Sequence, residues 1–207
     1  MSLRHLALSV LLRTETVGGD GSPPSAGRGE DDNSCRFCGG IRGQVELGHD
    51  DGSTAHACAL CQLVLRLDRP RIDDEAMLIW LPEMSQPALN MLMRGIQSRL
   101  RALGEPLYVE STPALDTEDR PWLYLAQQAL LARREAASAR LGTDRPSELA
   151  DALLRLSPSA YARRRQLLGG VRLLASGRFF DGEADVLPQI VDSWRSQPPA
   201  ETTGTSP

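Results

Sequence analysis

Four cysteines are the only cysteines in the chain, and they are the residues best placed to do chemistry. They form two Cys-x-x-Cys pairs, Cys35 with Cys38 and Cys58 with Cys61, separated by 19 residues. Each pair can present two thiolates from a single turn, and the gap is long enough to bring both pairs to one tetrahedral Zn²⁺. Two disulfides or four unrelated buried thiols are the alternatives. Cysteines two residues apart suit a metal better than a bridge, so the spacing predicts zinc.

The predicted zinc is structural. Four thiolates close the coordination shell and leave no position for a catalytic water. A catalytic thiol is not indicated either, because no cysteine lies outside the set. No glycine-rich phosphate-binding loop is present in the sequence.

A metal-dependent endonuclease of the HNH type is the rival hypothesis. Such enzymes often carry a structural four-cysteine zinc beside a separate His/Asn/His set, which binds the catalytic metal and activates water. Between the two cysteine pairs the chain offers His49 and His56, with Asp50 and Asp51 nearby. Both histidines are otherwise polar loop residues.

The nuclease set is incomplete in the sequence. No histidine follows Cys61, where Gln62 and Leu63 stand instead. The asparagines are Asn33 and Asn90, and neither lies inside the finger. A catalytic metal site would therefore lack at least one ligand.

The charge balance disfavours a third hypothesis, a zinc module that binds nucleic acid. The formal net charge is −4, whereas a general nucleic-acid binder is usually basic. All 23 basic residues are arginine. Two clusters, Arg133-Arg134 and Arg163-Arg164-Arg165, could meet phosphates or an acidic partner, or simply form a solvated helix face.

The residues around the cysteines predict how they are held. Gly39 and Gly40 follow Cys38, and glycine permits the positive φ that a sharp metal-binding turn requires. The run QLVLRLD after Cys61 suits a helix. The first pair is thus expected on a turn and the second on the first turn of a helix, which is the arrangement of a treble-clef finger.

The remainder of the chain predicts a mainly helical body. An apolar strand is expected at Ala76–Leu81, ended by Pro82. Ser85 is expected to cap a helix that ends at Gly104. Its predicted apolar face is Leu89, Leu92, Met93, Ile96, Leu100 and Leu103. Further helices are expected at about 121–141, 146–156, 157–169 and 184–194, with an extended or loop segment at 171–180.

The predicted organisation is an α+β fold, with the zinc finger packed on the helical body. Residues 1–34 are expected to hold a strand or short helix at 3–13 and a Gly/Ser/Pro-rich linker. The zinc module with its following strand spans 35–82, the helical body 83–195, and a disordered tail 196–207. The apolar run Leu6–Leu12 is too short to span a bilayer, so a soluble cytoplasmic protein is expected.

Several segments together resemble one family. CRFCGG, CALC, LIWLPEMSQPALNMLM, VRLL and QIVDSW occur in the order found in the IcmJ/DotN component of the Dot/Icm type IVB secretion system. The resemblance covers roughly residues 35 to 195, and its most specific part is the run Leu81–Asn90.

The resemblance implies a degenerate HNH fold with zinc held by Cys35, Cys38, Cys58 and Cys61. The family is not known as a nuclease. It implies a non-enzymatic subunit of the type IV coupling complex, bound to a C-terminal segment of the coupling ATPase at the cytoplasmic face of the inner membrane, where effector proteins are received. Two departures are a Gly/Pro-rich region before Cys35 and a shortened gap between the cysteine pairs. A relative that serves plasmid transfer is therefore an open alternative.

Overall fold

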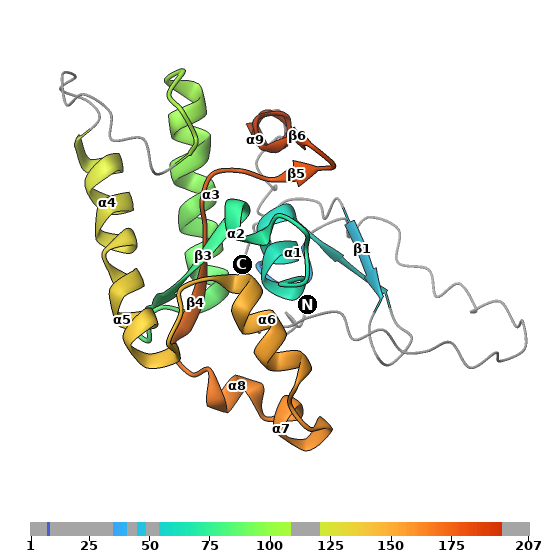
Figure 1. The fold of residues 1–207 in the computed structure, drawn as a ribbon. Coiled ribbons are helices and arrows are strands. Elements are labelled where there is room, and N and C mark those ends of the chain that lie inside the picture. The colour runs from blue at the N-terminus through green and yellow to red at the C-terminus, as the bar shows by residue number, and fades with distance from the viewer. Residues whose placement is uncertain (1–7, 9–34, 41–44, 49–53, 109–120, 196–207) are drawn as a thin grey trace, which may run out of the picture.

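The computed structural model describes residue 8 and residues 35–40, 45–48, 54–108 and 121–195 (Figure 1). This part of the chain is a mixture of helices and short two-stranded antiparallel sheets. The element expected at 3–13 lies outside the described residues except for Leu8, which is buried. The expected linker and the expected tail also lie outside them.

Two sheets position the candidate site. Strands β1 (Val45–Gly48) and β2 (Thr54–Ala57) form a hairpin between the two cysteine pairs. Strands β3 (Ala76–Trp80) and β4 (Val171–Ala175) pair antiparallel, with Ala76 opposite Ala175 and Trp80 opposite Val171. The segment after residue 170, expected to be extended or loop, therefore begins as a strand that pairs with β3.

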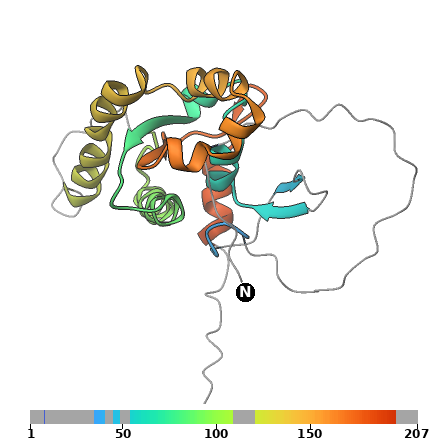
Figure 2. The same ribbon diagram turned by 90° about the horizontal axis from the view of Figure 1, so that it is seen from below.

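The helices surround the β3–β4 pair. In Figure 2 this pair lies between α3 (Gln86–Ala102) on one side and α6 (Pro146–Leu154) on the other. Helix α3 also packs on α9 and α1, and α5 packs along β3. A small hairpin of β5 (Phe180–Asp181) and β6 (Ala184–Asp185) precedes α9. The helices are α1 (Ala59–Leu65), α2 (Ile72–Glu75), α3 (Gln86–Ala102), α4 (Pro121–Leu131), α5 (Arg133–Leu141), α6 (Pro146–Leu154), α7 (Pro158–Ala162), α8 (Arg164–Leu167) and α9 (Leu187–Arg195). No helix in these described ranges is long and apolar enough to cross a membrane.

Helix α3 begins and ends as predicted, but its buried face is rotated. The Ser85 hydroxyl accepts a hydrogen bond from the Ala88 amide, and Gly104 takes a positive φ of 71° just after the helix. Leu92 was expected in the core and is 39% exposed. The reason is that three polar residues occupy the opposite edge of the buried face: Gln86, Asn90 and Gln97.

Two predicted helices are each divided in two. The helix expected at 121–141 is interrupted at Ala132, although the Ala132 amide still donates to the Gln128 carbonyl at 2.9 Å. The helix expected at 157–169 breaks at Arg163, whose ψ of 4° departs from helical geometry. The last helix begins at Leu187 and not at residue 184, because Ala184 and Asp185 pair with β5.

One hydrophobic core joins the cysteine region to the body. Buried side chains run continuously from Cys35 and Phe37 through α1, β3 and β4 to Val191 and Trp194 of α9. The strand assigned by sequence to the zinc module, β3, pairs with β4 from the far end of the chain.

Asp73 of α2 supplies the N-terminal cap of α6 from a distant part of the sequence. Its carboxylate accepts from the Ser147 amide at 2.9 Å and from the Ser147 hydroxyl at 2.6 Å. Partial burial raises the pKa of Asp73, but these bonds and the Arg145 guanidinium outweigh it and hold the pKa below its ordinary value. The cap is therefore a carboxylate at neutral pH.

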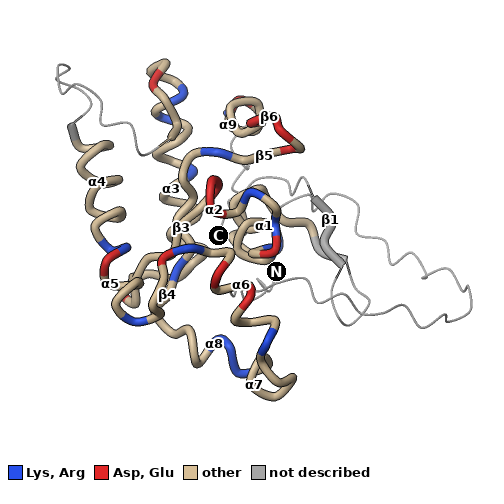
Figure 3. The backbone as a smooth tube through the Cα atoms, viewed as in Figure 1, with Lys and Arg blue, Asp and Glu red and all other residues tan. Residues whose placement is uncertain are grey.

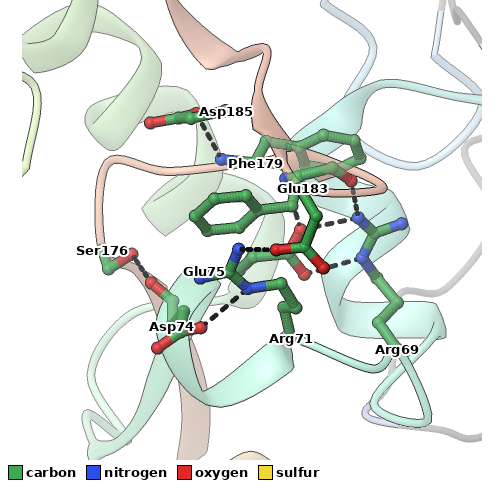
Figure 4. A network of polar contacts seen from close by, with 9 residues as sticks. Arg69, Arg71, Asp74, Glu75, Ser176, Phe179, Glu183 and Asp185 are labelled. Carbon is green, nitrogen blue, oxygen red and sulfur yellow. Dashed lines mark hydrogen bonds and ion pairs between the residues drawn. The ribbon is translucent and has the colours of Figure 1, made fainter.

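A buried ion pair fixes the β5–β6 hairpin on α2 (Figure 4). Glu75 is fully buried and accepts two hydrogen bonds from the Arg69 guanidinium, at 2.6 and 2.7 Å. It also accepts from the Phe180 amide at 2.7 Å, while Arg69 donates to the Phe180 carbonyl. The Arg69 guanidinium lies 4.3 Å from the centre of the Phe179 ring. Removing the carboxylate would leave a desolvated arginine without its counter-charge.

We expect Glu75→Ala to lower the free energy of unfolding by about 3–5 kcal/mol, the usual cost of breaking a buried pair. Urea denaturation measures this. Glu183→Ala is the control, because Glu183 reaches Arg71 at 3.4 Å with a side chain that is 97% exposed. Its unfolding midpoint should match that of the unmodified protein. Equal midpoints for the two variants would show that the buried pair does not hold the hairpin.

Candidate metal centre

The four cysteines converge in the structure. Their sulfur atoms all lie within 4.8 Å of one another, with Cys35, Cys58 and Cys61 buried and Cys38 half-buried. None forms a disulfide, so the disulfide alternative is not found. The Cys38 and Cys58 sulfurs are 3.8 Å apart. Two sulfurs about 2.3 Å from a common tetrahedral centre are separated by about 3.8 Å, so the cluster has the dimensions for zinc.

The first pair lies on a tight turn that two glycines make possible. The Gly39 amide donates to the Cys35 carbonyl at 2.9 Å, and Gly39 has a positive φ of 69°. Gly40 does not have a positive φ and serves another purpose. A Cβ atom there would lie 2.7 Å from the Arg94 guanidinium and 2.8 Å from the Met91 sulfur. Gly40 thus lets the turn approach α3 closely.

The second pair begins a helix, as predicted. Cys58 is the N-cap of α1, with extended backbone (φ −72°, ψ 163°), and Cys61 lies in the first turn. The Arg36 amide donates to the His56 carbonyl at 3.0 Å, which ties the Cys35 turn to β2. The order along the chain is therefore turn, hairpin and helix, with one cysteine pair at each end.

A chain of buried hydrogen bonds connects the cluster to the central sheet. The Asn90 amide donates to the Cys61 sulfur at 3.3 Å. The Gln86 amide donates to the Asn90 oxygen at 2.9 Å and to the Leu173 carbonyl of β4 at 2.8 Å. The Leu173 amide donates back to the Gln86 oxygen at 2.8 Å. The orientation of the Cys61 sulfur is thus fixed by α3, and α3 is fixed by β4.

Sequence reasoning missed the role of these two polar residues. From the sequence, Asn90 is an asparagine outside the finger and the last residue of the run Leu81–Asn90, and no contact with the cysteines is predicted for it. The sequence does contain a signal for this contact. Gln86 and Asn90 are four residues apart, so they share one face of a helix whose buried positions are mostly apolar. Buried amides require partners, so such a pair predicts a polar contact in the core.

Arg94 places a positive charge beside the thiolates. Half-burial lowers the pKa of its guanidinium, and attraction to the Cys38 and Cys58 sulfurs partly offsets that lowering. The guanidinium also lies 5.8 Å from the centre of the Trp194 ring. A divalent metal with four thiolates carries a net charge of about −2, so a neighbouring cation stabilises the loaded site.

The sulfurs themselves compete for protons. A hydrogen bond from Cys38 lowers the pKa of Cys35, whereas a hydrogen bond to Cys35 raises that of Cys61. A metal ion held by all four sulfurs requires each of them as a thiolate. Protons compete with the metal for the sulfurs, so metal affinity falls as pH falls.

Most of the candidate nuclease residues lie outside the part of the chain that the structure describes. His49, Asp50, Asp51 and Asn33 lie outside the described residues. His56 is half-buried on β2. Within the described part of the chain, the four cysteines are the only group of three or more His, Cys, Asp or Glu side chains close enough to share a metal ion.

Scanned against protein-family models and against curated proteins, the chain matches none. What it does must therefore be inferred from its own residues.

Purified protein should contain one zinc ion per chain by elemental analysis. Chelation at neutral pH, or mild acidification without chelator, should release the ion and expose four reactive thiols, because protons compete with the metal for sulfur. Calorimetry should show a lower unfolding temperature once the metal is removed. Protein that lacks stoichiometric metal, or that unfolds at the same temperature without it, would contradict the assignment.

Asn90→Leu should retain zinc but weaken its binding about 10- to 100-fold, the usual effect of losing a hydrogen bond to a metal ligand. Competition with a chromophoric chelator measures the affinity. In cobalt-substituted protein the sulfur-to-metal charge-transfer band should also shift, which a general loss of stability would not cause. Leu92→Ala is the control, on the same helix with an exposed side chain. Equal affinity in the two variants would rule out a role for the Asn90 amide.

Proposed function

We propose that this chain is a non-enzymatic, zinc-stabilised assembly subunit of a type IVB-like secretion or conjugation coupling complex. In this proposal it binds a C-terminal segment of the coupling ATPase, and is cytoplasmic and held at the inner membrane through that partner. The proposal rests on the IcmJ/DotN-like segments and on how those segments meet in the fold.

One observation carries the proposal. Three segments of the resemblance, CALC, LPEMSQPALN and VRLL, are joined by a single chain of hydrogen bonds. It runs from Cys61 through Asn90 and Gln86 to Leu173. Segments far apart in the sequence thus form one hydrogen-bonded network, which joins the four-cysteine cluster to β4. Because these three segments contact one another in the fold, they support an architecture in common with the IcmJ/DotN family better than separate motif matches would.

The local fold supports the finer part of the proposal, a treble-clef finger of the degenerate HNH type. The turn, the β1–β2 hairpin and α1 follow one another in the order of that finger. Four sulfur ligands leave no place for a reacting water, which favours a scaffold over an enzyme.

Helix α4 offers the surface for the ATPase segment. Its sequence PWLYLAQQALL is apolar on nearly all sides, which is unusual for a helix that faces water on one side. Trp122 and Leu125, three residues apart, are 59% and 65% exposed. Such a pair can anchor an amphipathic helix of a partner, and a large aromatic residue suits the centre of a protein interface.

The test is a binding titration between this chain and the C-terminal cytoplasmic segment of the coupling ATPase from the same genome. We expect micromolar or tighter binding, weakened at least about tenfold by Trp122→Ala with Leu125→Ala. Leu92→Ala on α3 is the matched control for loss of an exposed leucine. Absence of binding at micromolar concentration would refute the proposal.

The same preparation tests the rival enzyme. Plasmid DNA incubated with Mg²⁺, Mn²⁺ or Ni²⁺ should stay intact. Cleavage by the unmodified protein that is lost in His49→Ala would establish the nuclease instead.

A further inference from the structure

A stretch of the body without acidic residues stands out in an otherwise acidic chain. From Ala152 to Phe180 there is no Asp or Glu, whereas the whole chain has a net charge of −4. The stretch covers the last turns of α6, then α7, α8 and β4. In Figure 3 the α7–α8 end of the molecule carries blue segments and no red ones. Its arginines are Arg155, Arg163, Arg164, Arg165, Arg172 and Arg178.

Three of these arginines are held by the fold. Arg172 donates to the Met84 carbonyl at 2.6 Å, and Arg178 lies 3.7 Å from the centre of the Tyr108 ring. Arg164 stacks on the Tyr161 ring at 4.1 Å and donates to the Tyr161 carbonyl. These intramolecular contacts account for three of the six arginines, so no partner is needed to explain them.

The others face solvent. Arg163 and Arg165 are exposed, and neither side chain makes a hydrogen bond or ion pair within the described part of the chain. Arg155 reaches Asp151 only at 3.9 Å, with both side chains largely exposed. Such a pair contributes little, so Arg155 is also free to meet another charge.

Two exposed leucines lie close to these arginines in the sequence, at the ends of α6 and α8. Leu154, the last residue of α6, is 52% exposed, and Leu167, the last residue of α8, is 60% exposed. Helix α8 has no buried residue at all. We call the set Leu154, Arg155, Arg163, Arg165 and Leu167 the α7–α8 surface. It combines two arginines without an ion pair in the described part of the chain, one weakly paired arginine, and two exposed leucines.

We propose that the α7–α8 surface binds an acidic amphipathic helix of a partner protein. Carboxylates on such a helix would meet the free guanidinium groups, and its apolar stripe would cover Leu154 and Leu167. Nucleic acid fits less well, because phosphate groups make no favourable contact with exposed leucine side chains and the chain is acidic overall. In addition, Tyr161 is buried beneath Arg164, so its ring cannot stack on a base. An anionic membrane fits less well because the surface has no exposed aromatic anchor.

This inference goes beyond the coupling complex, since it depends on charge and exposure at one end of the body and not on the resemblance. The surface is also separate in sequence from α4, where the ATPase segment was placed. Either proposal can therefore fail while the other stands.

The probe is a fluorescent peptide of about 18 residues, five helical turns, with leucines at i, i+3, i+4 and i+7 spacing and glutamates elsewhere. A scrambled peptide of the same composition, oligothymidine, and vesicles of phosphatidylcholine with phosphatidylglycerol are compared with it. Fluorescence anisotropy and, for vesicles, co-sedimentation with the full chain measure binding. We expect the amphipathic peptide to bind with a Kd of about 100 µM or tighter, and more weakly at high salt.

The variants locate the site. Arg163→Gln with Arg165→Gln, and separately Leu167→Ser, should each weaken peptide binding about tenfold. Arg99→Gln with Arg195→Gln removes the same charge from exposed positions on α3 and α9, and should leave binding unchanged. Equal binding of the scrambled peptide, stronger binding of oligothymidine or vesicles, equal loss in the control, or no binding to any probe would each overturn the proposal.

Discussion

The contact on which much of this structure depends is the hydrogen bond from Asn90 to the Cys61 sulfur. Four sulfurs within 4.8 Å of one another repel when ionised, and only a cation at their centre makes the arrangement favourable. The neighbours of the cluster reduce the remaining cost. Arg94 adds a positive charge beside Cys38 and Cys58, and Asn90 donates a hydrogen bond to the buried Cys61 sulfur.

Because Asn90 is itself held by Gln86, the cysteine cluster is tied to the body of the fold. Gln86, at the start of α3, bonds β4 through its side-chain amide as a neighbouring strand would, accepting from the Leu173 amide and donating to the Leu173 carbonyl. A displacement of the β3–β4 pair would therefore change the position of the Asn90 amide that donates to Cys61. This network lies in the core of the fold. The two proposed binding surfaces lie elsewhere, on peripheral helices that include α4 and α8.

The sequence allowed the cysteine cluster and the ends of α3 to be predicted because local rules decide both. Cysteine spacing limits the geometry of a metal site, and Ser85 with Gly104 marks the limits of a helix whatever lies around it. Tertiary contacts decided what was missed. Leu92 turned outward because Gln86 and Asn90 had buried partners on other elements, and no local pattern contains those partners. The β5–β6 hairpin was missed for the same reason, since Glu75 holds it from about a hundred residues away in the sequence.

The pairing of β3 with β4 has a consequence for biosynthesis. A ribosome releases both cysteine pairs long before Val171–Ala175 has been made, so the sulfurs can capture an ion while the nascent chain still lacks its sheet. At that moment the ion has sulfur contacts alone. We expect its exchange with the surrounding metal pool to slow in two stages, first when Asn90 emerges and docks, and finally when Leu173 locks Gln86 in place.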